Sequence, residues 1–130
     1  MIVIDASVLA PALADDGGDG ARARTRLRGE ELAAPEIIDL EVASVLRRQV
    51  TAGQILERRC LLALADLAEV PLRRAAHRPL LVRTWELRHH LTIYAAAYVA
   101  LAEALGVPLL TADGHLSRAA GPRCAMELLA

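Results

Sequence analysis

The sequence predicts an α/β fold, an α/β/α sandwich whose short central sheet is mostly parallel. Short apolar segments alternate with helical patterns along the whole chain, as they do in parallel sheets joined by helices. The length of 130 residues suits a single domain. Apolar residues make up 55% of the composition and charged residues 24%, so the chain can bury a core and is not expected to be disordered.

Five apolar segments are the predicted strands. The first, residues 2–4, is a run of β-branched residues that ends at Asp5, as in a buried strand that leads into a helix. The segment 107–111 is similarly apolar, and the last segment is expected at an edge of the sheet. In chain order, the predicted strands are residues 2–4, 31–34, 70–72, 107–111 and 124–127.

Seven helices are predicted around these strands. Capping and breaking residues mark their ends: Ser7 follows the first strand, Pro35 opens the third helix and Gly106 ends the sixth. Residues 15–20, Asp-Asp-Gly-Gly-Asp-Gly, predict a surface loop. The predicted helices cover residues 7–14, 21–28, 35 to a break at 51–53, 54–69, 79–89, 92–105 and 113–118.

The composition argues against several classes of function. All 15 basic residues are arginine, and without lysine the P-loop, Schiff-base and receiver-domain chemistries lack an essential group. Cys60 and Cys124 stand far apart, without the spacing of a disulfide framework or a zinc site. The net charge of −1 and the absence of phenylalanine argue against a strongly basic or base-stacking surface for nucleic acid.

We expect a cytoplasmic protein. The amino terminus has no basic lead and reaches the acid Asp5 at once, so it does not resemble a secretory signal. No apolar stretch approaches the roughly 18–20 residues of a membrane-spanning helix. No membrane association is therefore expected.

Three acidic residues are candidate ligands of a metal ion. Asp5 and Asp113 follow two predicted strands, and ligands gather beyond the carboxyl ends of parallel strands. If these two strands are neighbours, both carboxylates share one edge of the sheet. Glu41 lies beside the apolar stripe of its helix. Carboxylates that gather without a cation repel one another, and oxygen ligands favour Mg²⁺ or Mn²⁺ as the cation.

Each acid also has a purely structural interpretation. Asp5 and Asp113 could each cap a helix. Glu41 could reach solvent or pair with an arginine such as Arg47 or Arg48. A series of four arginines has two interpretations: it forms either a solvated helix face or a contact to phosphate. The four residues are Arg22, Arg24, Arg26 and Arg28.

Four sequence blocks occur in a recognisable order and spacing. They are Ile-Val-Ile-Asp-Ala-Ser at 2–7, Pro-Glu-Ile-Ile-Asp-Leu-Glu-Val at 35–42, the segment 91–103 with its Leu-Thr-Ile-Tyr start, and Leu-Leu-Thr-Ala-Asp at 109–113. Together they resemble a PIN domain of the VapC toxin type. The resemblance covers nearly the whole chain and implies one PIN domain over residues 1–130.

The resemblance implies a Mg²⁺-dependent endoribonuclease toxin of a type II toxin–antitoxin system. Such proteins typically dimerise and are neutralised by a cognate VapB-like antitoxin, so a homodimer and a heterotetramer or larger complex are expected. By resemblance, Asp5, Glu41 and Asp113 match the family's first, second and fourth acidic positions, which makes them the expected catalytic residues and metal ligands. Ser7 and Thr111 match hydroxyl residues that line the same pocket.

One position departs from the family pattern. Members usually have Tyr-Asp-Ala-Ala-Tyr-Val where residues 94–99 read Tyr-Ala-Ala-Ala-Tyr-Val, so Ala95 replaces the third acidic residue. The change is engineered or natural, and it predicts an enzyme of reduced activity.

The alternative is an inactive binding module that only dimerises and binds antitoxin or RNA. Its dimer surface could use apolar residues of 54–69, which could equally fill the core. A phosphatase ranks last because Ser7 stands where a second aspartate is needed.

Overall fold

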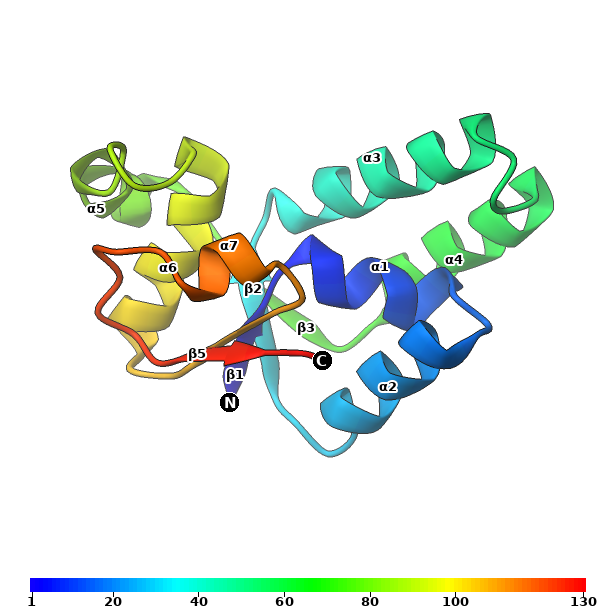
Figure 1. Cartoon of the computed structure of the whole chain (residues 1–130), viewed down its shortest axis with the longest axis horizontal. Coiled ribbons are helices and arrows are strands. Elements are labelled where there is room, and N and C mark those ends of the chain that lie inside the picture. The colour runs from blue at the N-terminus through cyan, green and yellow to red at the C-terminus, as the bar shows by residue number, and fades with distance from the viewer.

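The computed structural model describes all 130 residues and is built around five parallel strands (Figure 1). β1 (Ile2–Ile4) is the central strand and lies between β2 (Leu32–Pro35) and β4 (Leu109–Thr111). β3 (Leu72–Ala75) and β5 (Met126–Leu128) form the two edges, so the order is β3-β2-β1-β4-β5. Every neighbouring pair is parallel. The predicted α/β fold is confirmed, and the sheet is wholly rather than mostly parallel.

The helices lie on two sides of this sheet. In Figure 1, α1 to α4 gather on one side of the strands, and α5 and α6 on the other. α6 packs on β1 and β2, whereas α1 packs against β4 and the three helices that follow it. No helix is both long enough and apolar enough to cross a membrane. The helices are α1 (Ala6–Ala14), α2 (Gly18–Leu27), α3 (Ile38–Thr51), α4 (Glu57–Glu69), the 3₁₀ turn η1 (Arg78–Leu80), α5 (Leu81–Glu86), α6 (Ile93–Leu105) and α7 (Gly114–Ser117).

The core is centred on β1 and β4. Val3, Ile4 and Leu109 are wholly buried, as expected for strands that are covered on both faces. α6 contributes an uninterrupted buried run over residues 96–102, and its small alanine side chains allow the helix to lie close to the strands. This packing fixes the carboxyl ends of β1 and β4 side by side.

The third helix begins later than predicted. Pro35 does not open it but ends β2, where it is in register with Ala75 of β3. The backbone N–H of Glu36 then donates to the carbonyl of Ala75, so strand pairing continues past the proline. α3 starts at Ile38. A proline without its own N–H suits both a helix start and a strand end, and the ladder with β3 decides between them.

The predicted loop at 15–20 is also partly wrong, because α2 starts at Gly18. The Asp15 carboxylate accepts hydrogen bonds from the backbone N–H groups of Gly17 and Gly20, which holds the start of the helix. A Cβ at Gly20 would lie 1.8 Å from the carbonyl oxygen of Asp15. Glycine is therefore needed here for close packing, whereas the sequence suggested a break.

Smaller differences affect the remaining elements. The helix predicted at 79–89 is the short turn η1 followed by α5 and ends at Glu86. β3 begins two residues and ends three residues after its predicted bounds, and it includes two arginines, Arg73 and Arg74. The apolar residues of α4 fall into two groups. Ala63 and Leu67 fill the core, whereas Leu61 and Leu62 are exposed. The other predicted helices and strands are present with ends shifted by up to three residues.

Replacing Thr92 by alanine is expected to destabilise the protein by about 1 kcal/mol, since Thr92 caps α6. Its Oγ1 accepts a hydrogen bond of 3.1 Å from the backbone N–H of Ala95. Urea unfolding followed by circular dichroism would measure the change. Thr25→Ala is the matched control, because Thr25 is exposed within α2 and its side chain makes no cap. Equal stabilities of the two variants would contradict the assigned cap.

Candidate functional site

Asp5 lies where β1 ends and α1 begins, and it is only 7% exposed. Its Oδ1 accepts hydrogen bonds from the backbone N–H of Ser7 at 3.0 Å and from Ser7 Oγ at 2.5 Å. Its Oδ2 accepts a hydrogen bond of 2.5 Å from Thr111 Oγ1. Asp5 therefore caps α1, as its structural interpretation proposed, and both of its oxygens are held in fixed positions.

No positive side chain neutralises this buried carboxylate. Burial raises the pKa of Asp5, and the hydrogen bonds from Ser7 and Thr111 oppose that rise only in part. None of the ion pairs in the protein includes Asp5. A buried acid without a cation is unfavourable when ionised, so a positive ligand would stabilise the site.

The two hydroxyl residues connect the ends of β1 and β4. Ser7 Oγ accepts a hydrogen bond of 2.8 Å from the backbone N–H of Ala112 and lies 3.3 Å from Thr111 Oγ1. Thr111 Oγ1 in turn accepts from the backbone N–H of Asp113 at 3.0 Å. Ser7 and Thr111 thus orient Asp5 and join it to the segment that carries Asp113.

Asp113 lies at the same edge of the sheet as Asp5, as predicted, because β1 and β4 are parallel neighbours. Its Oδ1 accepts hydrogen bonds from the backbone N–H groups of His115 at 2.9 Å and Leu116 at 3.5 Å. Asp113 therefore caps α7. The capping interpretation is correct for both aspartates, and both caps lie at the carboxyl ends of neighbouring strands.

Glu41, in the first turn of α3, accepts a hydrogen bond of 2.5 Å from the hydroxyl of Tyr98 on α6. It forms no ion pair, so the interpretation that it pairs with Arg47 or Arg48 is wrong. Burial, and then the hydrogen bond to Glu41, raises the pKa of Tyr98. The phenol accordingly stays protonated and keeps donating.

Tyr98 is the residue that sequence reasoning missed. It is 2% exposed, and a buried tyrosine hydroxyl nearly always finds a partner. The available signal was a tyrosine inside an alanine-rich buried helix. That signal does not identify the partner, which is 57 residues away in the sequence.

Ala95 lies in the first turn of α6 and packs against the core. Residues three apart on a helix share a face, so position 95 is on the same side of α6 as Tyr98. Through Tyr98 this side of the helix contacts Glu41. We use the term acidic edge for the carboxylates Asp5, Glu41 and Asp113. An acidic side chain at position 95 would therefore extend the acidic edge, and alanine offers no ligand atom.

The chemistry of the candidate donor atoms suits a divalent cation, but the number of donors that lie close together does not. The candidate ligands are all oxygen atoms, which suits Mg²⁺ or Mn²⁺, and no positive side chain pairs with Asp5. However, no three acidic, histidine or cysteine side chains lie close enough together to hold one metal ion. Asp5, Glu41 and Asp113 are therefore not gathered around a single position in this structure, although the sequence predicted that they would be.

Tyr98→Phe is expected to lower the free energy of unfolding by about 1 kcal/mol, because it removes one hydrogen bond between α6 and α3. Tyr94→Phe is the matched control, since Tyr94 is 61% exposed on the same helix and should change stability by less than about 0.5 kcal/mol. Chemical denaturation would measure both variants. A loss of the same size in both would show that the hydroxyl of Tyr98 has no structural role.

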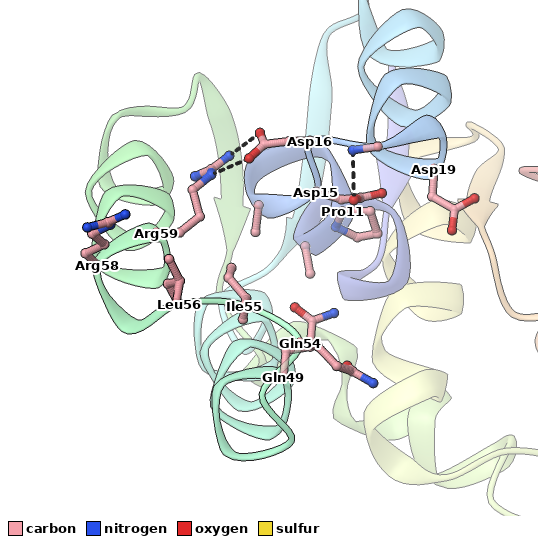
Figure 2. A pocket seen from close by; sticks show the side chains of 13 residues that line it. Pro11, Asp15, Asp16, Asp19, Gln49, Gln54, Ile55, Leu56, Arg58 and Arg59 are labelled. Atoms are coloured by element: carbon pink, nitrogen blue, oxygen red, sulfur yellow. Dashed lines mark hydrogen bonds and ion pairs between the residues drawn. The ribbon is translucent and has the colours of Figure 1, made fainter.

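A cavity lies at the other end of α1 (Figure 2). Its volume is about 670 Å³, and residues from α1, α2, α3 and α4 line it. Three aspartates lie around it, but each has a partner. Asp15 accepts from backbone N–H groups, Asp16 accepts two hydrogen bonds of 3.0 Å from Arg59, and Asp19 pairs with Arg22. This second acidic group is already satisfied and is not a candidate metal site.

Comparison with known proteins shows the family to which this chain belongs. Residues 2–122 match the family described as PIN domain. Among solved structures, Mycobacterium tuberculosis VapC20, titled a Sarcin-Ricin loop cleaving toxin, superposes with a TM-score of 0.70 at 18% identity and covers 90% of this chain and 93% of its own. VapBC2 from Rickettsia felis, bound to a promoter DNA fragment, gives 0.66 at 15% identity and covers all of both chains.

Sequence relatives are more similar. Ribonuclease VapC1 of M. tuberculosis is 41% identical over 128 residues, which is 98% of this chain and 96% of that protein. Ribonuclease VapC12 of the same organism is 39% identical over the full length of both chains. The chain belongs to the PIN-domain family, in the group of VapC ribonucleases.

Proposed function

We propose that this protein is a Mg²⁺-dependent endoribonuclease toxin of a VapBC pair, impaired by Ala95. The observation that carries the proposal is Asp5: a buried carboxylate that pairs with no positive side chain, at the carboxyl end of the central strand and at the same end of the sheet as Asp113. The relatives named ribonucleases, which match nearly the whole chain, support the same activity.

Asp5, Glu41 and Asp113 would hold Mg²⁺ or Mn²⁺, directly or through water. When bound, the ion would polarise the scissile phosphate and lower the pKa of a bound water. Ser7 and Thr111 hold Asp5 in one orientation before RNA arrives, which reduces the reorganisation that the reaction requires.

Glu41 is assigned the task of orienting the attacking water. Tyr98 donates to one of its oxygens and leaves the other without a protein donor. The hydrogen bond from the Tyr98 hydroxyl holds the Glu41 carboxylate in one orientation, which a water-positioning group needs. Tyr98 is thus a positioning residue.

Ala95 supports a second candidate, a binding module without activity. Four carboxylates could balance two divalent ions, whereas three leave one positive charge uncompensated, so metal occupancy falls. Such a chain would still fold, dimerise and hold its antitoxin. An acidic edge suits an arginine of a VapB-like antitoxin, because guanidinium–carboxylate pairs are strong and directional.

The assembly expected for either candidate is a homodimer that joins a VapB-like antitoxin in a heterotetramer or larger complex. The similarity of fold to a VapBC complex supports the partner. Exposed Leu61 and Leu62 on α4 offer apolar surface for one of these contacts. The expected location is the cytoplasm.

An RNA cleavage assay of the Ala95→Asp variant, with and without Mg²⁺, tests the function and separates the two candidates. Cleavage that requires the metal supports the nuclease. Its absence in a folded variant that still binds antitoxin favours the binding module. Mapping the cut ends would then identify the target RNA.

A further inference from the structure

The four arginines on or next to α2 have different partners. Arg24 donates to two backbone carbonyls near the end of α1, and Arg26 binds two glutamates. Arg28 is exposed at the end of the helix and forms no ion pair. Arg22 pairs only with Asp19, one turn earlier on the same helix. The series is therefore not one uniform solvated face.

Arg22 faces a cleft that begins at the acidic edge. The cleft has a volume of about 330 Å³, and its walls include Ser7, Pro11, Ala112 and Leu129. Ser7 Oγ lies 2.5 Å from Asp5 Oδ1, so the cleft starts one side chain away from the buried carboxylate. None of the other three arginines lines it.

We propose that this cleft holds the RNA nucleotide next to the cleaved bond, with the phosphate of that nucleotide on Arg22. The inference rests on the proposed function and specifies how the same site binds its substrate. A guanidinium group binds phosphate through two parallel hydrogen bonds. The volume is at the lower end of the roughly 300–1,000 Å³ typical of small-molecule sites, and the apolar wall of Pro11, Ala112 and Leu129 suits a sugar or base.

Asp19 regulates how readily Arg22 can bind phosphate. Their side chains are 55% and 76% exposed, for Arg22 and Asp19 respectively, and an exposed pair within one helix is weak. Exchange of the Asp19 carboxylate for a phosphate is therefore easy. Asp19 also lines the cleft, so its negative charge opposes the binding of RNA. The two residues should have opposite effects on affinity.

The first experiment measures the affinity of the chain for a labelled single-stranded RNA of mixed sequence in the presence of Mg²⁺. Arg22→Gln is expected to raise Kd about tenfold and to reduce the slope of log K against log salt by about 0.7. Arg28→Gln is the matched control and should change Kd by less than about twofold. Asp19→Asn should lower Kd severalfold.

The second experiment adds Arg22→Gln to the Ala95→Asp variant and measures cleavage. A phosphate contact outside the reacting atoms predicts a higher KM and an unchanged kcat, which a general loss of structure would not produce. Thermal unfolding checks that every variant is folded.

The outcomes separate this inference from the proposed function. If Ala95→Asp cuts RNA but Arg22→Gln and Arg28→Gln behave alike, the cleft is not a phosphate site and the nuclease assignment stands. If Asp19→Asn weakens binding as Arg22→Gln does, the ion pair only supports α2 and the inference fails. If neither the chain nor Ala95→Asp binds or cuts RNA, the proposed function fails and the inference fails with it.

Discussion

Replacing Ala95 by aspartate is expected to raise the rate of Mg²⁺-dependent RNA cleavage by at least about 100-fold, the scale of a single electrostatic group in an active site. Position 95 is on the same side of α6 as Tyr98, which contacts Glu41. The new carboxylate would therefore add a ligand to the acidic edge. It also lies in the first turn of α6, where the helix dipole favours a negative charge, so the fold should be retained.

Ala95→Asn is the control for this prediction, because asparagine has nearly the same shape as aspartate without its charge. Isothermal titration of Mg²⁺ should show tighter binding for Ala95→Asp than for Ala95→Asn, in parallel with the cleavage rates. Equal rates for the original chain and Ala95→Asp at the same metal concentration would refute the assignment of Ala95 as a lost ligand.

Replacing Asp5 by asparagine should have opposite effects on activity and stability. Added to Ala95→Asp, it should abolish cleavage, because the central carboxylate is lost. It should also raise Tm by a few degrees, or about 1 kcal/mol in a domain of this size. Asparagine caps helices as well as aspartate does and carries no buried charge.

The stability gain from Asp5→Asn should depend on pH. Burial raises the pKa of Asp5 above its unfolded value of 3.8, so between these two pKa values the folded chain binds more protons than the unfolded chain. Stability therefore falls as pH rises through that window. The difference in Tm between the two chains should accordingly be larger at about pH 8 than at about pH 4.

Magnesium gives a second readout for Asp5. An ion that binds only the folded chain raises its Tm, so Mg²⁺ should stabilise the Ala95→Asp variant and not the version that also carries Asp5→Asn. Asp66→Asn, which changes an exposed aspartate on α4, should leave the response to Mg²⁺ intact. A response that survives Asp5→Asn would exclude Asp5 as a ligand.

Sequence reasoning succeeded where one local cue dominated. The β-branched run at residues 2–4 and the apolar run before Thr111 predicted two buried strands, and parallel pairing of these strands places Asp5 and Asp113 at the same end of the sheet. It failed where one cue has two meanings. Pro35 suits a strand end as well as a helix start, and the glycines at 17–20 pack closely as well as break a helix.

The remaining parts of the site depend on contacts between distant segments. Glu41 was recognised as an acid beside an apolar stripe, but its partner Tyr98 lies on a different helix and is not indicated by any local pattern. The proposed loss of a ligand at Ala95 has no physical signature, because alanine is favourable in a buried helix. Only comparison with the family indicates that an acid is missing there.

The hydrogen bond from Thr111 to Asp5 spans 106 positions of the chain. A growing polypeptide therefore cannot complete the surroundings of Asp5 until almost all of it has been synthesised, and a fragment that stops before β4 keeps the hydrogen bonds from Ser7 but lacks the one from Thr111. If the protein cleaves the RNA of its own cell, this order of assembly would delay activity until the whole molecule is present. Any surface that an inhibitor must bind would then be present as well.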